Sequence, residues 1–101
     1  MYKYLIEEFT KSPRDVHTVP LTNRPYSWFH VFVEKGYLCI ESAHSRTPAT
    51  GVKKRRLNED ELNTMLSIYH RRTSGEKVSK EAQQCTYSQV YWYGIFAEMN
   101  L

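Results

Sequence analysis

The sequence lacks the long apolar stretches that mark membrane and secreted proteins. No apolar run approaches the roughly 18–20 residues that a membrane-spanning helix needs. The first residues include Lys3, Glu7 and Glu8, so they do not form the uninterrupted apolar stretch of a signal peptide. Internal repeats and low-complexity tracts are also absent, which excludes solenoid and linker architectures. We therefore expect a soluble, cytoplasmic protein.

Cysteine is scarce, and its spacing indicates neither a zinc site nor a disulfide framework. The chain has two cysteines, Cys39 and Cys85, which form no CxxC pair. Their apolar surroundings predict two buried small side chains, with a structural disulfide as the alternative. The histidines are scattered along the chain: His17, His30, His44 and His70. Because they show no HxH or HExxH spacing, we expect no metal and no cofactor.

Motifs for catalysis are missing as well. The sequence contains no G-x-S-x-G elbow, no phosphate-binding P-loop and no dinucleotide fingerprint. Catalytic chemistry would need residues that the fold brings together. His44 in its loop, or Asp15 with His17, could lie close to a carboxylate from another part of the chain. A non-catalytic protein is therefore the favoured expectation, and a small enzyme is the least favoured one.

Length and composition predict one domain spanning residues 1–101. The 101 residues are 41% hydrophobic, and a chain of this size buries roughly 60–70% of its unfolded surface. That burial is enough for a core without metal or disulfide support.

The strongest β-strand signal is a hairpin. Residues 28–33 and 37–42 are two short runs of aromatic and β-branched residues around Glu34-Lys35-Gly36. Glycine readily takes a positive φ, so Gly36 predicts a turn followed by a glycine bulge.

The register of this hairpin has two possible solutions. The bulged turn places His30 opposite Ile40. A two-residue turn would instead pair His30 with Glu41, but it requires Lys35 at a positive φ. We predict the bulged turn for that reason, and a shift of one residue would change every cross-strand partner.

The clearest helix spans residues 58–73. Asn58 is a capping residue with Glu61 three positions later, and Gly75 stands where a helix stop is expected. An apolar stripe recurs at helical spacing: Leu62, Met65, Leu66 and Tyr69.

The remaining segments give weaker signals. Residues 79–85 and 87–97 favour two short helices, although the second range also has strong β-propensity. Residues 2–6 indicate a strand, with a short helix as the competitor. Proline-containing residues 10–27 and residues 43–56 are predicted to be loops. The fold class is therefore α+β: a small antiparallel sheet built on the central hairpin, packed against one amphipathic helix and a helical C-terminal section.

The net charge of +3 is located in one segment. Residues 53–72 contain three acidic and six basic residues, the latter being Lys53, Lys54, Arg55, Arg56, Arg71 and Arg72. A helix from Asn58 to Arg72 rises about 21 Å at 1.5 Å per residue, so the two basic clusters are too far apart to hold one small anion. A polymer of phosphates could contact both. We therefore expect a nucleic-acid-binding module that uses these six residues.

A second expectation concerns the C-terminal aromatic residues. Tyr87, Tyr91 and Tyr93 cannot all face inward on one helix, so some of them would reach a surface. The alternative function is therefore a protein–protein interaction or inhibitor-type domain that uses these tyrosines, and a homodimer is one form of it.

Overall fold

The computed structural model describes residues 1–21, 24–45 and 52–101, and these form an α+β arrangement. The elements follow one another as α1 (Tyr2–Lys11), β1 (Arg14–His17), β2 (Trp28–Glu34), β3 (Tyr37–Ser42), β4 (Arg55–Leu57), α2 (Glu59–Thr73), α3 (Ser79–Cys85) and α4 (Gln89–Glu98). Within the described ranges, no helix is both long and apolar enough to cross a membrane. The predicted fold class is confirmed.

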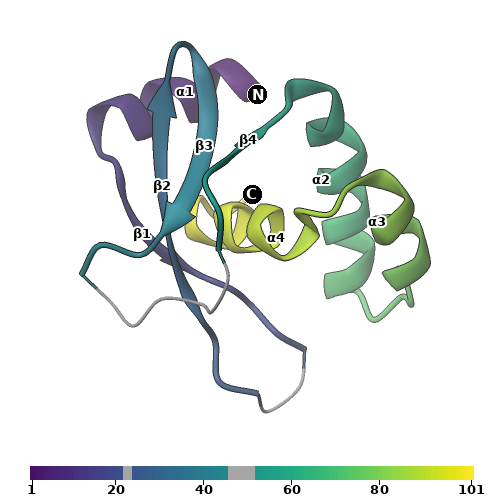
Figure 1. The fold of residues 1–101 in the computed structure, drawn as a ribbon. Helices are drawn as coiled ribbons and strands as arrows, with labels where there is room; N and C mark the ends of the chain where they lie inside the picture. The colour runs from purple at the N-terminus through teal and green to yellow at the C-terminus, as the bar shows by residue number, and fades with distance from the viewer. Residues whose placement is uncertain (22–23, 46–51) are drawn as a thin grey trace.

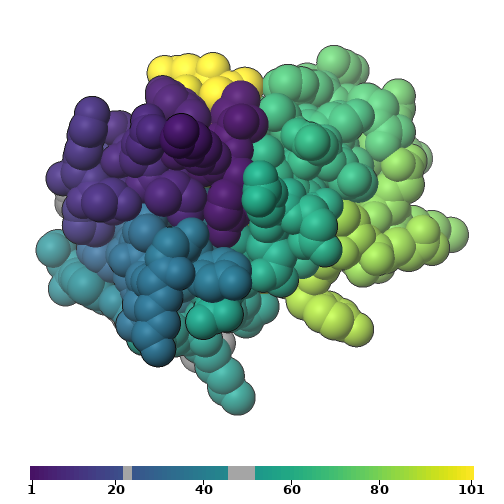
Figure 2. Space-filling model, turned by 90° about the horizontal axis from the view of Figure 1, so that it is seen from above, coloured from purple at the N-terminus to yellow at the C-terminus, as the bar shows by residue number. Residues whose placement is uncertain are grey.

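The four strands form one antiparallel sheet in the order β1-β2-β3-β4. Helices α1 and α4 lie behind this sheet in Figure 1, with α1 packed on β2 and β3 and α4 packed against β1. Helix α2 packs on α4 and α3 on α2, so these two extend the molecule to one side. In Figure 2, α1 and the first strands (purple to blue) lie on one side of the molecule, and α2 and α3 (green) lie on the other. The molecule thus consists of a sheet, the helices α1 and α4 behind it, and the helices α2 and α3 packed beside α4.

The core lies between the sheet and the helices. Alternation along the strands turns Phe29, Val31, Leu38 and Ile40 towards the helices, and all four are fully buried. We call this side of the sheet the inner face. The Tyr2 hydroxyl joins α1 to the sheet, because it donates to the Leu57 carbonyl (2.7 Å) and accepts from the Leu38 N–H (2.9 Å).

The prediction of a strand at residues 2–6 is wrong, because this segment begins helix α1. Tyr2, Leu5 and Phe9 repeat at helical spacing and are buried against the sheet. Packing of that apolar stripe outweighs the β-propensity of the individual residues. The predicted 10–27 loop also needs correction, since Arg14–His17 forms edge strand β1 directly after Pro13.

The hairpin is confirmed, but its predicted register is wrong. His30 lies opposite Glu41, and not opposite Ile40. Lys35 and Gly36 both have positive φ values, of 53° and 79°, as a two-residue type I′ turn requires.

The three predicted helices after the sheet are confirmed. At the end of α2, the Glu76 N–H donates to the Arg71 carbonyl and the Gly75 N–H donates to the Arg72 carbonyl, with Gly75 at φ 94°. This is a Schellman motif, in which glycine supplies the left-handed residue. The expected capping box at the start of α2 does not form, because Asn58 makes no side-chain cap and Glu61 accepts from Trp92 Nε1 (3.0 Å).

Both cysteines are free thiols, so the alternative of a disulfide is not realised. Cys39 is buried as predicted, and Cys85 is half-buried.

Candidate functional site

The side of the sheet that faces away from α1 and α4, which we call the outer face, carries a row of titratable side chains. Asp15 of β1 lies opposite His30 of β2, and His30 lies opposite Glu41 of β3. Cross-strand partners point to the same face of a sheet. Three groups that are far apart in the sequence therefore meet across the middle of the sheet.

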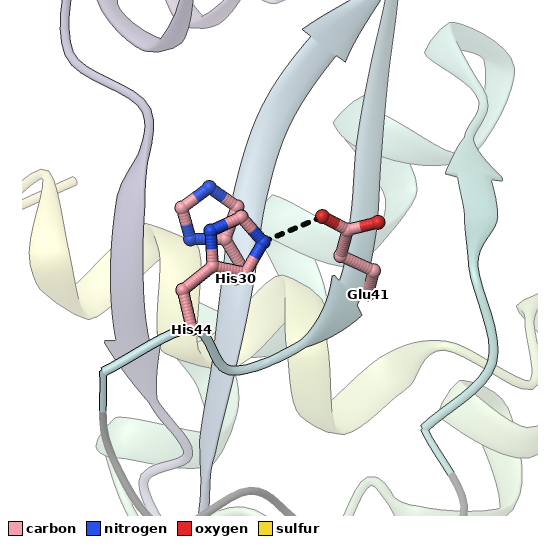
Figure 3. A group of neighbouring side chains, drawn as sticks. All are labelled: His30, Glu41 and His44. Atoms are coloured by element: carbon pink, nitrogen blue, oxygen red, sulfur yellow. Dashed lines mark hydrogen bonds and ion pairs between the residues drawn. The ribbon is translucent and has the colours of Figure 1, made fainter.

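His30 is held in place by two neighbours. Its Nδ1 lies 2.9 Å from Asp15 Oδ1, and its residue is only 8% exposed. The ring of His44 stacks on the ring of His30, with centroids 3.4 Å apart and planes 9° from parallel. Figure 3 shows His44 in front of His30, reaching the outer face from the segment directly after β3.

Asp15 fixes this segment to the sheet. The backbone N–H of His44 donates to Asp15 Oδ1 (3.0 Å), and the N–H of Ser45 donates to Asp15 Oδ2 (2.8 Å). His44 Nε2 in turn lies 2.7 Å from Glu41 Oε2, the contact drawn as a dashed line in Figure 3. We call Asp15, His30, Glu41 and His44 the histidine–carboxylate cluster.

The Asp15 side chain remains a carboxylate far into the acid range. Its burial raises the pKa, but the backbone hydrogen bonds from His44 and Ser45 and the contact with His30 lower it more, so that the pKa is about 2. Asp15 is therefore a fixed negative charge that accepts hydrogen bonds at neutral pH.

This charge should contribute measurably to stability. Because the folded-state pKa of about 2 lies below the ordinary value of 3.8, ionised Asp15 stabilises the fold above pH 3.8, and this stabilisation disappears as the pH falls through 2. The difference corresponds to about 2 kcal/mol. We expect Asp15→Asn to lower the free energy of unfolding by that amount at pH 7, measured by urea denaturation of the metal-free protein.

The deficit of Asp15→Asn relative to the parent should shrink by about half at pH 3. Asp60→Asn removes an exposed carboxylate from the first turn of α2 and should cost at most about 1 kcal/mol. A deficit that is the same at pH 7 and pH 3 would show that the Asp15 charge does not contribute in this way.

A second group of residues occupies the outer face beside the cluster. Arg56 lies over the ring of Tyr37, with its guanidinium carbon 4.1 Å from the ring centroid. Lys54 Nζ lies 5.8 Å from the centroid of Phe32 and 2.9 Å from a carboxylate oxygen of Glu34. We call Phe32, Tyr37, Lys54 and Arg56 the aromatic–cation patch.

The structure divides the six predicted nucleic-acid-binding residues into two groups. Lys53, Lys54 and Arg56 are exposed. Arg55 alternates to the other side of β4, where it donates to Ser88 Oγ (3.3 Å) and lies over Tyr91. The basic segment thus presents part of its charge on the outer face and uses part of it inside the fold.

The two arginines at the end of α2 are engaged elsewhere. Arg71 forms ion pairs with Glu76 and Glu81. Arg72 donates to the Val19 carbonyl (2.7 Å) and lies over the ring of Tyr93 at 4.4 Å. Neither arginine belongs to the aromatic–cation patch.

The three tyrosines proposed as an interface have three different environments. Tyr87 is 93% exposed, whereas Tyr93 is 5% exposed and packs beneath Arg72. Tyr91 is half-buried, with its ring 5.0 Å from that of Phe29. Of these three tyrosines, only Tyr87 is presented to solvent as a large aromatic surface.

The histidine–carboxylate cluster was not predicted as a unit, although His44 and Asp15 were both named as residues that the fold could bring to a partner. The signal was present in the alternative hairpin register, which pairs His30 with Glu41, but the prediction took the other register. The pairing of Asp15 with His30 depends on β1, which lies in a segment predicted to be a loop. Comparison of the chain with models of known protein families, with curated proteins and with solved structures found no significant match.

Proposed function

We propose that the protein binds single-stranded nucleic acid on the outer face of its sheet, through the aromatic–cation patch. The observation that carries the proposal is Arg56, an exposed guanidinium lying over the 42% exposed ring of Tyr37. Among the described residues, no carboxylate forms an ion pair with Arg56. This cation is therefore available to a phosphate.

The chemistry of the patch suits an unpaired strand. Exposed rings on a sheet offer flat surfaces on which bases stack, and base stacking tolerates any sequence. The bases of a duplex are stacked on each other and cannot use such rings. Lys53 and Lys54 lie three and two residues before Arg56 and are exposed, so they supply further phosphate contacts. Lys54 must release Glu34 to make its contact.

The test is a titration of a fluorescently labelled single-stranded oligonucleotide of mixed sequence, followed by anisotropy at two salt concentrations. Removing a stacking ring with Tyr37→Ala should weaken binding roughly 5- to 150-fold. Removing one phosphate contact with Arg56→Ala should weaken binding and reduce the slope of log K against log[salt] by about 0.7.

Arg71→Ala is the matched control, because it removes the same charge from a guanidinium that is occupied by Glu76 and Glu81. It should leave the affinity close to that of the parent. If Arg71→Ala weakens binding as much as Arg56→Ala, the protein responds only to overall charge. If Arg56→Ala and Tyr37→Ala both bind like the parent, the proposal is wrong.

The alternative is a protein-interaction role, favoured by one observation. Tyr87 is 93% exposed and Val90, three residues later, is 46% exposed, which places an apolar surface at the start of α4. Association through this surface would depend on protein concentration and hardly on salt. Sedimentation of the parent and of Tyr87→Ser at two protein concentrations separates this role from nucleic-acid binding.

A further inference from the structure

We propose that His30, His44 and Glu41 bind one divalent transition-metal ion of the zinc class on the outer face. One donor atom from each of these side chains lies within 4.8 Å of the other two. The donors come from β2, from β3 and from the segment directly after β3, so the sheet itself brings them together (Figure 3). This inference is independent of nucleic-acid binding, because none of the three residues belongs to the aromatic–cation patch.

The donor set selects the class of metal. Two imidazole nitrogens and one carboxylate oxygen suit Zn²⁺ and its first-row neighbours. Ca²⁺ and Mg²⁺ prefer sites made of oxygen donors alone. Three protein ligands would leave a fourth position of a tetrahedral ion for water or an external ligand.

Asp15 prepares His30 for this role. Because the Asp15 carboxylate lies 2.9 Å from His30 Nδ1, that nitrogen carries the proton and Nε2 keeps the lone pair that a metal needs. A carboxylate behind a ligating histidine is a recurrent feature of metal sites, where it fixes the tautomer and the ring orientation. Asp15 is therefore a positioning residue, and the same carboxylate holds the backbone of His44 in place.

The cluster combines a fixed part with an adjustable part. The side chains of His30 and Asp15 are 11% and 8% exposed, whereas that of His44 is 54% exposed and that of Glu41 is 31% exposed. Donors around a tetrahedral zinc ion lie about 3.3 Å apart, whereas His44 Nε2 and Glu41 Oε2 are 2.7 Å apart, so these two more exposed side chains must adjust to admit the ion. The proton on His44 Nε2 must also leave that atom, and its Nδ1 can take it, so that the neutral ring then offers its Nε2 lone pair.

The experiment is a calorimetric titration of the full chain with ZnCl₂ after dialysis against EDTA and then into a buffer that does not bind metal. We expect saturable binding of one ion per chain and an increase in Tm with Zn²⁺ concentration, because a ligand of the folded state stabilises it. Replacing Zn²⁺ with Co²⁺ should give the visible absorption of a low-coordinate nitrogen and oxygen site. Mg²⁺ should not compete.

Two substitutions remove ligands without opening the core. His44→Ala truncates an exposed side chain and Glu41→Gln preserves its shape, and each should weaken Zn²⁺ binding at least tenfold. Asp15→Asn should weaken it 10- to 100-fold, as loss of a supporting carboxylate does elsewhere. Circular dichroism of each variant confirms that it is folded.

Two controls separate this site from other zinc ligands of the chain. His70→Ala removes an exposed histidine on α2, and Cys85→Ser removes the half-buried thiol. Both should bind Zn²⁺ like the parent. The proposal is overturned if the parent shows no saturable binding, if folded His44→Ala and Glu41→Gln both keep the affinity of the parent, or if Cys85→Ser loses it.

Discussion

Replacing Gly94 with alanine is expected to lower the free energy of unfolding by about 2–3 kcal/mol. A Cβ atom at this position of α4 would lie 2.6 Å from the His17 carbonyl oxygen and 3.0–3.1 Å from two ring carbons of Phe29. The carbonyl belongs to β1, so relief of the contact requires the helix and the strand to separate. Overpacking of this kind costs about 1–3 kcal/mol or more.

The sign of the effect makes this experiment decisive. In an exposed helix, glycine to alanine would stabilise by about 1 kcal/mol. Urea denaturation of Gly94→Ala should therefore show destabilisation where helix propensity alone predicts the reverse. As a comparison, Gly75→Ala meets no atom within 4 Å but has φ of 94°, and it should cost about 1–2 kcal/mol from backbone strain alone. A more stable Gly94→Ala variant would show that α4 does not press against β1.

Truncation of Trp92 is the second large expected effect, about 3–5 kcal/mol for Trp92→Ala. This side chain is fully buried, stacks on Phe96 with ring centroids 5.5 Å apart, and donates from Nε1 to Glu61 of α2 at 3.0 Å. Large-to-small changes of buried aromatic residues lose transfer free energy and leave a cavity. The loss should appear as a lower urea midpoint with an unchanged m-value.

Two further variants divide this effect between packing and hydrogen bonding. Trp92→Phe keeps a ring but removes the N–H, whereas Glu61→Gln keeps an oxygen acceptor. We expect Glu61→Gln to cost under about 1 kcal/mol, since a hydrogen bond to a charged group is only moderately stronger than one to a neutral group. If Trp92→Ala cost no more than Glu61→Gln, the indole would not be a central part of the core.

Local signals along the chain predicted most of the helices. For residues 58–73 the structure confirms the helix and its glycine stop. Of the predicted stripe, Leu62 and Met65 are buried and Leu66 and Tyr69 are half-buried, while Ile68, which the stripe left out, is buried as well. For α1, the helix was only the competitor of the predicted strand, because Tyr2 to Ile6 favours a strand by composition. The helical periodicity becomes decisive only when Phe9 is included. In a short amphipathic segment, burial of one face matters more than the propensities of its residues.

The hairpin register shows a conflict that the sequence alone did not settle. A positive φ at Lys35 is unfavourable, because the left-handed conformation of a residue with a side chain costs about 1–2 kcal/mol. The observed register places Val31 opposite Ile40 and Val33 opposite Leu38, so apolar side chains share the inner face. The predicted register would have placed His30 beside Ile40. Matching of the two faces outweighs the strain in the turn.

The candidate sites depend on this same register. The histidine–carboxylate cluster needs β1 paired with β2 and the unbulged turn. The strand pairing joins separate segments and is not encoded in local patterns, whereas the unbulged turn is the register that turn chemistry disfavoured. The basic segment was recognised from composition, but alternation along β4 decides that Arg56 faces outward while Arg55 faces Ser88. The sequence therefore located the basic residues but did not show which of their side chains face outward.

The lengths of the two outermost strands have a consequence for behaviour at high concentration. β1 has four residues and β4 has three, and each contributes charged side chains, among them Arg14 and Asp15 on one border and Arg55 and Arg56 on the other. Unpaired backbone at a sheet border is the template on which a second chain adds in amyloid growth, and brief, charged borders offer little of it. Intermolecular strand addition, and the fibrils that follow from it, are thus disfavoured by the architecture itself.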